Sequence, residues 1–392
     1  MMNRKQMEEI LQKYSTPLYV FDIGVLKQRI AYLRKMLPGH VSLCYAVKAN
    51  TFILSHMKDV IDRFEVCSPG ELRICQAQQL PPQKLVISGV YKTPQLMEEL
   101  ISGRFPAGIY TVESVEQFYL LKSLADRYGE KIRLLLRLNS GSQFGVEGDE
   151  IREMVRIGLR DPNLKIQGIQ YFSGTQKSSI KRLAKELKIA DAFLQSLNEE
   201  FGIQLPELEF GPGFPVAYFK GESFDEEDFL KQFSELLEGL THKGKITLEL
   251  GRSIAASCGT YMTQVVDIKT NRGQNYAIMD GGIHQMVYYG QSMAMKQPIC
   301  ELFPPRTGEA SRHWNLCGSL CTMNDILVKQ FPADDLKIGD TVLFKNTGAY
   351  AMTEGIALFL SRDLPQILIK EEHGGLTCAR AAQPVYPLNM PQ

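Results

Sequence analysis

The stretch Tyr45-Ala46-Val47-Lys48-Ala49-Asn50 decides how the first half of this chain is interpreted. It ends a short apolar run, Ser42 to Val47, and so predicts a strand whose carboxyl end presents one amine. A lysine is rarely buried unless it is paired or used chemically. At the end of an apolar strand its pKa can fall far enough for the amine to condense with an aldehyde. An isolated lysine would instead extend its charged head into solvent, so the choice depends on the rest of the chain.

Strand and helix patterns alternate through the region from residue 42 to residue 250. The predicted strands lie at 42–47, 64–67, 85–88, 107–111, 132–138, 166–172, 207–210 and 246–249. Helical patterns between them include Pro94–Ile101, Val115–Tyr128, Asp149–Gly158 and Ile180–Phe201. Such repeats predict an α/β fold, a (β/α)8 TIM barrel, with reactive groups at the carboxyl ends of the strands. A doubly wound open sheet is the alternative, but no Gly-x-Gly-x-x-Gly turn follows the first strand.

The composition changes after Arg252. Small residues lead into β-rich segments at Tyr261–Ile268, Tyr276–Asp280 and Thr341–Phe344, separated by glycine, asparagine and proline. This pattern predicts a mostly β domain after the barrel. From Glu371 the chain is polar, contains proline and lacks periodicity, which predicts a loop or a weakly ordered tail.

Length and charge limit the classes of partner. The 392 residues are enough for two domains, and lysine plus arginine equals aspartate plus glutamate at 44 each. No basic stripe or charged tail stands out, so we expect neither nucleic acid nor an anionic membrane as partner. Met1 to Tyr14 lacks the apolar core of a signal peptide, and no apolar stretch approaches a membrane span. We therefore expect a soluble, cytoplasmic protein.

The cysteines and histidines favour neither disulfides nor a metal. The eight cysteines are scattered, and disulfide frameworks belong to small secreted domains, so reduced thiols are the better interpretation. The six histidines do not cluster with cysteines or acids at ligand spacing. Cys317 and Cys321 lie four residues apart without a second pair, and we expect no metal site.

Further segments repeat the pattern of one family in the same order. They are Tyr45–Asn50, Phe64–Glu71, Gly168–Gln176, Gly211–Pro215, Glu249–Arg252, Gly318–Asp325 and Gly348–Tyr350. The chain resembles the group IV, fold type III enzymes that use pyridoxal phosphate on an alanine-racemase-like barrel. The resemblance is to their diaminopimelate and ornithine decarboxylase branch. It implies a PLP-binding barrel over 26–255, with 1–25 and 256–392 forming the β-rich domain, which would include the early strand Leu18–Phe21.

The resemblance implies roles for individual residues. Lys48 would carry pyridoxal 5′-phosphate, and Glu249 would meet the nitrogen of its ring. A carboxylate there keeps the ring protonated, whereas racemases of this fold place an arginine, so Glu249 favours decarboxylation. The other implied cofactor contacts are Phe172, stacked on the ring, and Thr175, Gly213, Gly251 and Arg252, around the phosphate. The hydroxyl of Tyr350 would reach the phosphate or the substrate. Without the family context, Glu249 and Arg252 would be a surface ion pair and Phe172 a core residue.

Two further implied features concern catalysis and the phosphate loop. Cys321 would supply a proton to the carbon that loses carbon dioxide, and the family contributes this cysteine across a dimer interface. A buried structural cysteine is the alternative for this residue type. Pro212 stands where the family commonly has a glycine and removes one backbone donor, although Gly213 can still serve.

The departures from the family concentrate on substrate contacts. Thr322 stands where diaminopimelate enzymes place a glutamate, Tyr288 lies near the place of a substrate-binding arginine, and Asp325 is the third expected substrate contact. Gln170 and Phe172 replace two histidines, and the loop between Asn139 and Ser142 is short. A buried site without a countercharge rejects a distal ammonium or carboxylate.

These departures predict a decarboxylase for an amino acid or conjugate with a neutral or tethered far end. Family members acting on carrier-protein thioesters or siderophore conjugates in secondary metabolism are similar in this respect. A homodimer with shared active sites is expected, and an acyl-carrier protein is a candidate partner. The alternatives are a diaminopimelate or ornithine decarboxylase, an amino-acid racemase, and a non-catalytic homologue that binds a partner.

Overall fold

A computed structural model describes residues 3–105, 107–306 and 310–391. The contacts divide the chain into two compact units. One consists of 30–215 and 224–254, and we call it the barrel unit. The other consists of 1–29, 216–223 and 255–392, and we call it the β-rich unit. The predicted domain bounds, 26–255 against 1–25 and 256–392, stay a prediction.

In the described part of the chain, eight parallel strands close into a barrel in sequence order, which confirms the predicted fold. The strands are β2 (Val41–Ala46), β3 (Arg63–Val66), β4 (Leu85–Ile87), β5 (Ile109–Val112), β6 (Ile132–Arg137), β7 (Leu164–Phe172), β8 (Glu207–Gly211) and β9 (Lys245–Leu250). The barrel closes where β2 pairs with β9, with Val41 opposite Ile246. Strands of this kind are buried on both faces and read as apolar runs, which is why the sequence reveals them.

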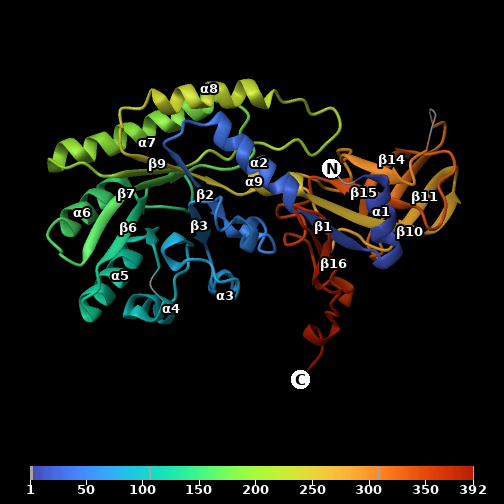
Figure 1. Cartoon of the computed structure of the whole chain (residues 1–392), viewed down its shortest axis with the longest axis horizontal. Coiled ribbons are helices and arrows are strands. Elements are labelled where there is room, and N and C mark those ends of the chain that lie inside the picture. The colour runs from blue at the N-terminus through green and yellow to red at the C-terminus, as the bar shows by residue number, and fades with distance from the viewer. Residues whose placement is uncertain (1–2, 106, 307–309, 392) are drawn as a thin grey trace. The chain divides into compact units, whose positions relative to one another are not determined.

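Helices cover the outside of the barrel strands (Figure 1). They are α3 (Pro69–Ala77), α4 (Pro94–Glu99), α5 (Val115–Tyr128), α6 (Gly148–Gly158), α7 (Ile180–Phe201) and α8 (Glu226–Glu238). Helix α2 (Ile23–Met36) leads into the barrel, and α9 (Arg252–Ala255) follows its last strand. The buried side chains of α7 recur every three or four residues, at Leu183, Leu187, Ala190, Leu194 and Leu197. This spacing gives α7 one apolar face.

The β-rich unit is built on one sheet, which has nine strands among the described residues. They are β1 (Leu18–Asp22), β10 (Gly259–Asn271), β11 (Gln274–Met279), β12 (Cys300–Phe303), β13 (His313–Cys317), β14 (Ile326–Pro332), β15 (Thr341–Lys345), β16 (Gln366–Lys370) and β17 (Leu376–Arg380). Strand β1 lies between β10 and β16, and all its residues are buried. Helix α1 (Arg4–Lys13) buries Ile10 against Leu18 and Val20 of this strand. The early strand is therefore central to the β-rich unit.

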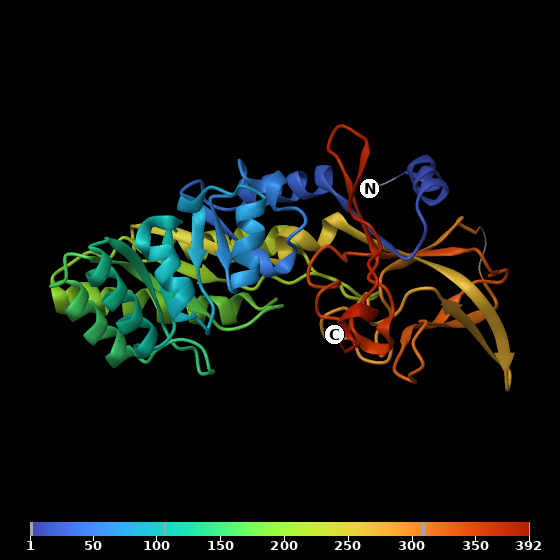
Figure 2. The same ribbon diagram turned by 90° about the horizontal axis from the view of Figure 1, so that it is seen from below.

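The tail corrects one prediction. We expected a loop or weakly ordered chain from Glu371, but Leu376–Arg380 forms β17 and pairs antiparallel with β16. Figure 2 shows this hairpin in red. The pairing uses backbone groups, and the side chains of β17 are largely exposed, so the strand has no apolar pattern to detect. The loop prediction for this segment was wrong.

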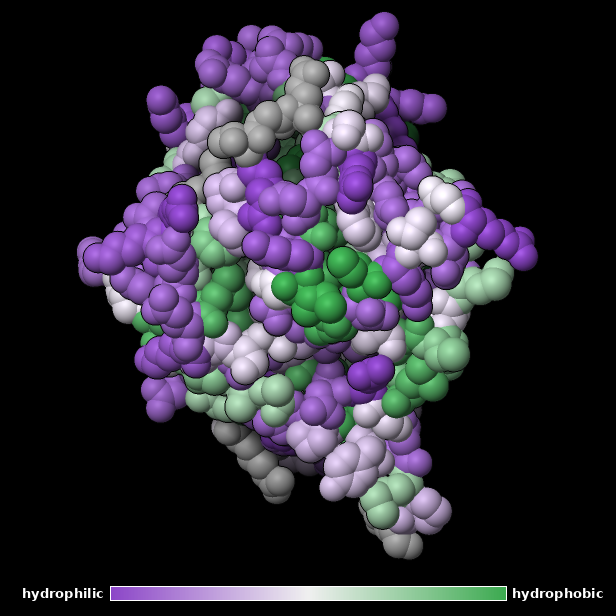
Figure 3. All heavy atoms as spheres, turned by 90° about the vertical axis from the view of Figure 1, so that its right-hand side faces the viewer, coloured by the Kyte–Doolittle hydropathy of each residue, from purple (hydrophilic) through white to green (hydrophobic). Residues whose placement is uncertain are grey.

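One side of the molecule carries mostly polar side chains. On the side shown in Figure 3, hydrophilic residues predominate, and hydrophobic residues form several small, separate groups. Among the described residues, no helix is long and apolar enough to cross a membrane. Small exposed apolar groups of this kind are ordinary on protein surfaces.

Candidate active site

Lys48 lies directly after β2, in the short 3-10 turn Val47–Ala49. Its Nζ is 2.6 Å from Glu65 Oε2 and 3.6 Å from Glu249 Oε1. The side chain of Lys48 is 41% exposed, whereas those of Glu65 and Glu249 are 4% and 10% exposed. The amine therefore lies at the carboxyl ends of the barrel strands, which we call the mouth of the barrel. Two buried carboxyl groups lie next to it.

The pKa values of the two carboxyl groups are shifted in opposite directions. Burial raises the pKa of Glu65, but the charge of Lys48 and hydrogen bonds with Glu249 and Lys48 outweigh it and bring the pKa to about 2. Burial and the charge of Glu65 raise the pKa of Glu249 well above its usual value. Glu65, which lies nearer to the amine, is therefore the counterion of Lys48. The sequence patterns did not single out Glu65, although it stands in the matching segment 64–71.

The glycine loop after β8 approaches the loop after β7 very closely. Gly213 has a φ of +59°, and a Cβ built on it would lie 2.2 Å from the carbonyl oxygen of Gly174 and 2.9 Å from Thr175 Cα. Only glycine fits there. Arg252 Nε donates to Thr175 Oγ1 over 3.4 Å. The structure thus brings the predicted phosphate contacts Thr175, Gly213 and Arg252 together, with Gly251 next to Arg252 in the chain.

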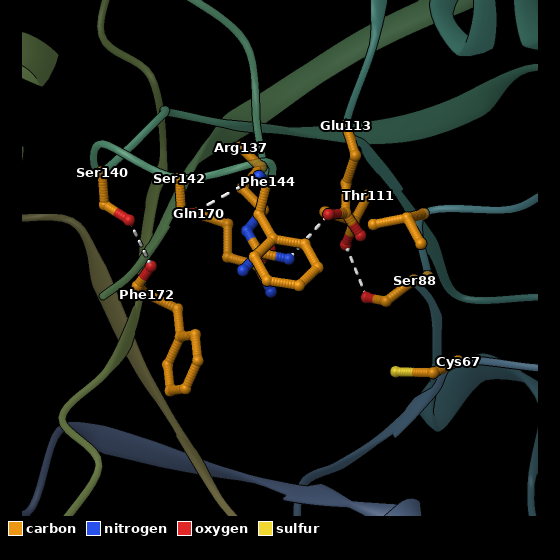
Figure 4. A network of polar contacts seen from close by, with 12 residues as sticks. Cys67, Ser88, Thr111, Glu113, Arg137, Ser140, Ser142, Phe144, Gln170 and Phe172 are labelled. Atoms are coloured by element: carbon orange, nitrogen blue, oxygen red, sulfur yellow. Dashed lines mark hydrogen bonds and ion pairs between the residues drawn. The ribbon is translucent and has the colours of Figure 1, made fainter. Parts of the chain in front are cut away.

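Phe172 ends β7 and lies between two cations. The Arg137 guanidinium carbon is 5.9 Å from the ring centroid, and Lys177 Nζ is 5.8 Å from it. A Cβ on Gly211 would lie 2.4 Å from Phe172 Cδ2, so a glycine at that position makes room for the ring. In Figure 4, Phe172 and Cys67 point into the same open space from opposite sides. The ring is placed at the mouth of the barrel, and its stacking on a cofactor stays a prediction.

Lys177 is a buried residue that the sequence did not single out. Its Nζ is 2.7 Å from Glu186 Oε2, 3.1 Å from Ser173 Oγ and 3.3 Å from the carbonyl oxygen of Gly211. Because Glu186 belongs to α7, this amine ties the loops after β7 and β8 to the outer helix. No local pattern predicts this role, because Lys177 lies in a polar stretch that reads as an ordinary loop.

A second polar group lies at the ends of β4, β5 and β6 (Figure 4). Arg137 Nη1 is 2.7 Å from Glu113 Oε2, and both side chains are nearly buried. Ser88 Oγ and Thr111 Oγ1 are 3.0 Å apart. The guanidinium carbon of Arg137 is also 4.9 Å from the centroid of the Phe144 ring. The signal that could have identified this group is a charged residue at the end of an apolar strand, as in Arg137.

In the β-rich unit, the segment Gly318–Asp325 presents Cys321 to solvent, while Thr322 is half-buried. Asp325 is 2% exposed and points inward. Its Oδ1 accepts from the Ile283 amide over 2.9 Å, and its Oδ2 accepts from the Leu320 amide over 2.8 Å. Its carboxylate thus shapes the segment, and contact between Asp325 and substrate stays a prediction.

Tyr288 is also held by contacts within the β-rich unit. Its side chain is buried, and its hydroxyl donates to the carbonyl oxygen of Lys345 over 2.5 Å. The ring centroid lies 5.2 Å from that of Tyr218. Tyr288 lines a hollow of about 230 Å³ together with Ile283, Met286, Val287, Gln291, Ser292, Met293, Pro298, Asn324, Ile326 and Leu327. Tyr350, the predicted phosphate contact of this unit, has a φ of +63° at the start of a turn.

Among the described residues, no group of three histidine, cysteine, aspartate or glutamate side chains is placed to hold a metal ion. Every predicted site residue of the barrel unit lies at the carboxyl ends of β2, β7, β8 and β9. The predicted residues of the β-rich unit, from Tyr288 to Tyr350, lie in the connections between its strands.

The comparisons with known proteins agree on one family. The family model described as the pyridoxal binding domain of pyridoxal-dependent decarboxylases matches residues 23–256. The chain is 26% identical to a diaminopimelate decarboxylase of Aquifex aeolicus, over 88% of this chain and 84% of that protein.

Two other relatives are named for conjugated substrates. The L-glutamyl-[BtrI acyl-carrier protein] decarboxylase of Niallia circulans is 24% identical, over 94% of this chain and 92% of that protein. The 2-[(L-alanin-3-ylcarbamoyl)methyl]-2-hydroxybutanedioate decarboxylase of Staphylococcus aureus is 25% identical, over 92% and 96% respectively.

A solved structure has the same fold. The structure of the Helicobacter pylori diaminopimelate decarboxylase complexed with L-lysine superposes with a TM-score of 0.85 at 23% identity. The match covers 97% of this chain and 98% of that one.

Proposed function

We propose that this chain, which belongs to the family of pyridoxal-dependent decarboxylases, acts on an amino acid or conjugate whose far end is neutral or tethered. Membership of the family makes the protein a carboxy-lyase that uses pyridoxal 5′-phosphate. The substrate is the part that we infer from the residues of this chain.

The mouth of the barrel fits the cofactor. The close approach of Gly213 to the backbone of Thr175 makes a concave loop pair beside the Arg252 guanidinium, as an anionic phosphate requires. When bound, the cofactor supplies a ring that accepts the electron pair left by a departing carboxylate. We propose that Lys48 holds its aldehyde carbon, that Glu249 meets the ring nitrogen, and that Phe172 lies against the ring.

The observation that carries the substrate proposal is the neutral character of the residues expected around the far end. In the described part of the chain, the side chains that line the hollow beside Tyr288 carry no charge. Thr322 also has a neutral side chain, and Asp325 is turned toward backbone amides. An ammonium or carboxylate desolvated there would have no opposite charge nearby, which costs several kcal/mol.

The names of two relatives support a conjugated substrate. The name of the Niallia circulans protein describes a glutamyl group on an acyl-carrier protein. The name of the Staphylococcus aureus protein describes an alanine joined through a carbamoyl link to a hydroxybutanedioate, which carries two carboxylates of its own, so this relative supports the tethered form and not the neutral one. We propose a substrate of the same kind for this chain, with an amide or thioester at the far end and an acyl-carrier protein as a candidate carrier.

We also propose a homodimer with shared sites, in which Cys321 of one copy serves the Lys48 site of the other. The exposed thiol of Cys321 would deliver a proton to the carbon that has lost carbon dioxide. A twofold arrangement of this kind gives two equivalent sites. A cytoplasmic location stays part of the proposal.

A carbon dioxide release screen tests the substrate class. Purified protein loaded with pyridoxal phosphate is assayed with free lysine, ornithine and diaminopimelate, and with amides and thioesters of the same amino acids. We expect kcat/KM to favour the neutral conjugates by a factor on the order of a thousand. Comparable turnover of free diaminopimelate would contradict the proposal and would indicate a diaminopimelate decarboxylase instead.

The rival activities give different signals in the same samples. A racemase would exchange the α-hydrogen for deuterium without release of carbon dioxide. A non-catalytic homologue would do neither, although it could still bind the cofactor.

A further inference from the structure

Gln170 and Glu209 form a pair inside the barrel, beneath Glu249. The two residues lie opposite each other on β7 and β8, and both are almost fully buried. Gln170 Nε2 is 2.8 Å from Glu209 Oε1 and 3.3 Å from Glu249 Oε2. The amide group of Gln170 therefore donates toward two carboxyl groups at once, one of which is expected to meet the cofactor.

Two buried oxygens of this pair lack a hydrogen-bond partner among the described residues. Within the described residues, Gln170 Oε1 and Glu209 Oε2 make no hydrogen bond. Both atoms are acceptors if Glu209 is ionised, and neither could then satisfy the other. A proton on Glu209 Oε2 turns one of them into a donor, and the Gln170 carbonyl oxygen is the free acceptor on the facing side chain. A protonated carboxyl group and a primary amide can then exchange two hydrogen bonds.

The surrounding charges also favour a proton on Glu209. Arg63 faces Glu209 Oε2 at 3.7 Å, but its guanidinium is already engaged with both oxygens of Glu207. Thr247 donates to Glu207 as well, over 2.5 Å.

The other ionisable groups that face Glu209 are Cys44, Glu65, Glu249 and the half-buried amine of Lys245. Lys48 lies against Glu65 and Glu249, Arg63 is bonded to Glu207, and Lys245 interacts with Asp62 and Glu207 as well as with Glu209. In the described part of the chain, the ion pair of Glu209 is the 3.7 Å contact with Arg63. The direction of the pKa agrees with a bound proton, because burial and the charge of Glu207 raise the pKa of Glu209 to about 8, against the opposing effect of Arg63.

We propose that Glu209 is a protonated carboxylic acid that pairs with the Gln170 amide and so keeps the N–H groups of that amide directed at Glu249. Glu209 is thus a positioning residue, which acts on the cofactor site through Gln170. The resembled family usually places a histidine where Gln170 stands, and this pair gives Glu249 a donor that does not titrate. The inference rests on the proposed role of Glu249 but not on the identity of the substrate.

Infrared spectroscopy of the cofactor-free protein tests the protonation state directly. Wild type at pH 7 should show carbonyl stretching bands of buried protonated carboxyl groups, and Glu209→Gln should lose one of them. The matched variant Glu249→Gln should keep the Glu209 band and lose its own. If Glu209→Gln leaves the bands of wild type unchanged, Glu209 is ionised and the proposal fails.

Unfolding experiments give a second readout. A carboxyl group whose folded pKa is raised contributes stability that is present below its unfolded pKa and lost as pH rises through the folded pKa. Between pH 5 and pH 9 the unfolding equilibrium constant of wild type should therefore increase relative to that of Glu209→Gln, by at least about tenfold. An identical pH dependence of the two proteins would overturn the proposal.

Kinetics separate positioning from simple packing. Glu209→Leu removes both hydrogen bonds and should lower kcat more than it raises KM, with a shift in the pH profile of the cofactor absorbance. Glu209→Gln can make the same two bonds as the protonated acid and should restore most of the lost kcat. If Glu209→Gln is as impaired as Glu209→Leu, the carboxylate form is the active one and the proposal is wrong. Because the infrared test needs no substrate, its outcome is independent of the proposed function.

Discussion

The mouth of the barrel and the segment Gly318–Asp325 of the β-rich unit present opposite kinds of surface. At the mouth, three cations have carboxyl partners: Lys48 with Glu65, Arg137 with Glu113, and Lys177 with Glu186. In the segment, Cys321 is exposed, and Met323 is 84% exposed. The charged side chains of the mouth are thus held in a bonded network, whereas Cys321 and Met323 of the segment are exposed.

This difference has an energetic consequence. Removing one member of a buried ion pair leaves an unpaired charge and typically costs about 3–5 kcal/mol. Changes at exposed positions usually stay within about 0.5 kcal/mol of wild-type stability. Substitutions at the mouth should therefore disturb both chemistry and stability, whereas substitutions at the exposed positions of the segment, such as Cys321, should leave stability nearly unchanged.

The largest effect is expected for Lys48→Ala. Without this amine the cofactor has no covalent anchor, and activity should fall by about a thousandfold or more. Borohydride reduction followed by peptide mass spectrometry should locate the cofactor on Lys48 in wild type and on no other lysine. The exposed helix residue Lys185 supplies the control, since Lys185→Ala should keep both the adduct and the activity.

A cofactor adduct on Lys92 would break this assignment. The buried amine of Lys92 also lies near the mouth, and burial lowers its pKa to about 8, so it is the most reactive competitor. Its Nζ is held by the carbonyl oxygen of Gly89 and by Gln117, which argues against that role.

Cys321→Ala should have the next largest effect. Loss of a proton donor costs about 100-fold to 10,000-fold in kcat, while the melting temperature should change little because the side chain is exposed. Cys378, an exposed cysteine on β17, gives the matched control: Cys378→Ala should behave as wild type.

Mixing Lys48→Ala with Cys321→Ala then tests whether the two regions combine across a dimer. Hybrid dimers would contain one intact site, so part of the activity should return after subunit exchange. A mixture that exchanges subunits but stays inactive would place Lys48 and Cys321 of the same copy in one site.

The fold was predictable because its signals are local. The barrel strands are apolar runs buried on both faces, and the predicted ranges lie within a few residues of the observed ones. Strand β17 was not predictable, because an exposed edge strand needs only backbone partners.

The bonded network of the mouth could not be predicted, because its partners come from distant strands. Arg63 meets Glu207 across 144 residues, and Gln170 meets Glu209 across 39. Closure of the barrel brings these pairs together, and no local spacing in the sequence predicts which residues will meet. In contrast, Lys48 and Arg252 stand in short motifs and were identified before the fold was known. Their functional roles, like that of Cys321, stay predictions.

Thr322→Glu tests whether charge at position 322 sets the substrate preference. A carboxylate at this half-buried position would supply a countercharge for a distal ammonium, so kcat/KM for free lysine or ornithine should rise relative to a neutral amide by about tenfold or more. Thr322→Gln has nearly the same shape without the charge and should leave the preference unchanged. Equal shifts in the two variants would show that size rather than charge sets the selectivity.

The smallest expected effect concerns His284, which is buried in the β-rich unit. Within the described residues, neither of its ring nitrogens makes a hydrogen bond. Burial, aided by the charge of Arg362, lowers the pKa of His284 to about 4. A histidine with a lowered folded pKa favours the neutral form, so its contribution to stability is present above the unfolded pKa and is lost as pH falls toward 4.

His284→Leu should therefore remove part of the acid sensitivity of the β-rich unit. Between pH 7 and pH 4 the free energy of unfolding of wild type should fall by about 1–2 kcal/mol more than that of His284→Leu. His313→Gln, at an exposed position on β13, controls for the loss of an imidazole and should track wild type. Denaturant titrations at several pH values measure the difference.

If wild type and His284→Leu lose stability in parallel, the buried ring accepts its proton without a loss in the free energy of unfolding. The β-rich unit would then tolerate a buried charge, and the neutral lining of its hollow would no longer argue against a charged substrate.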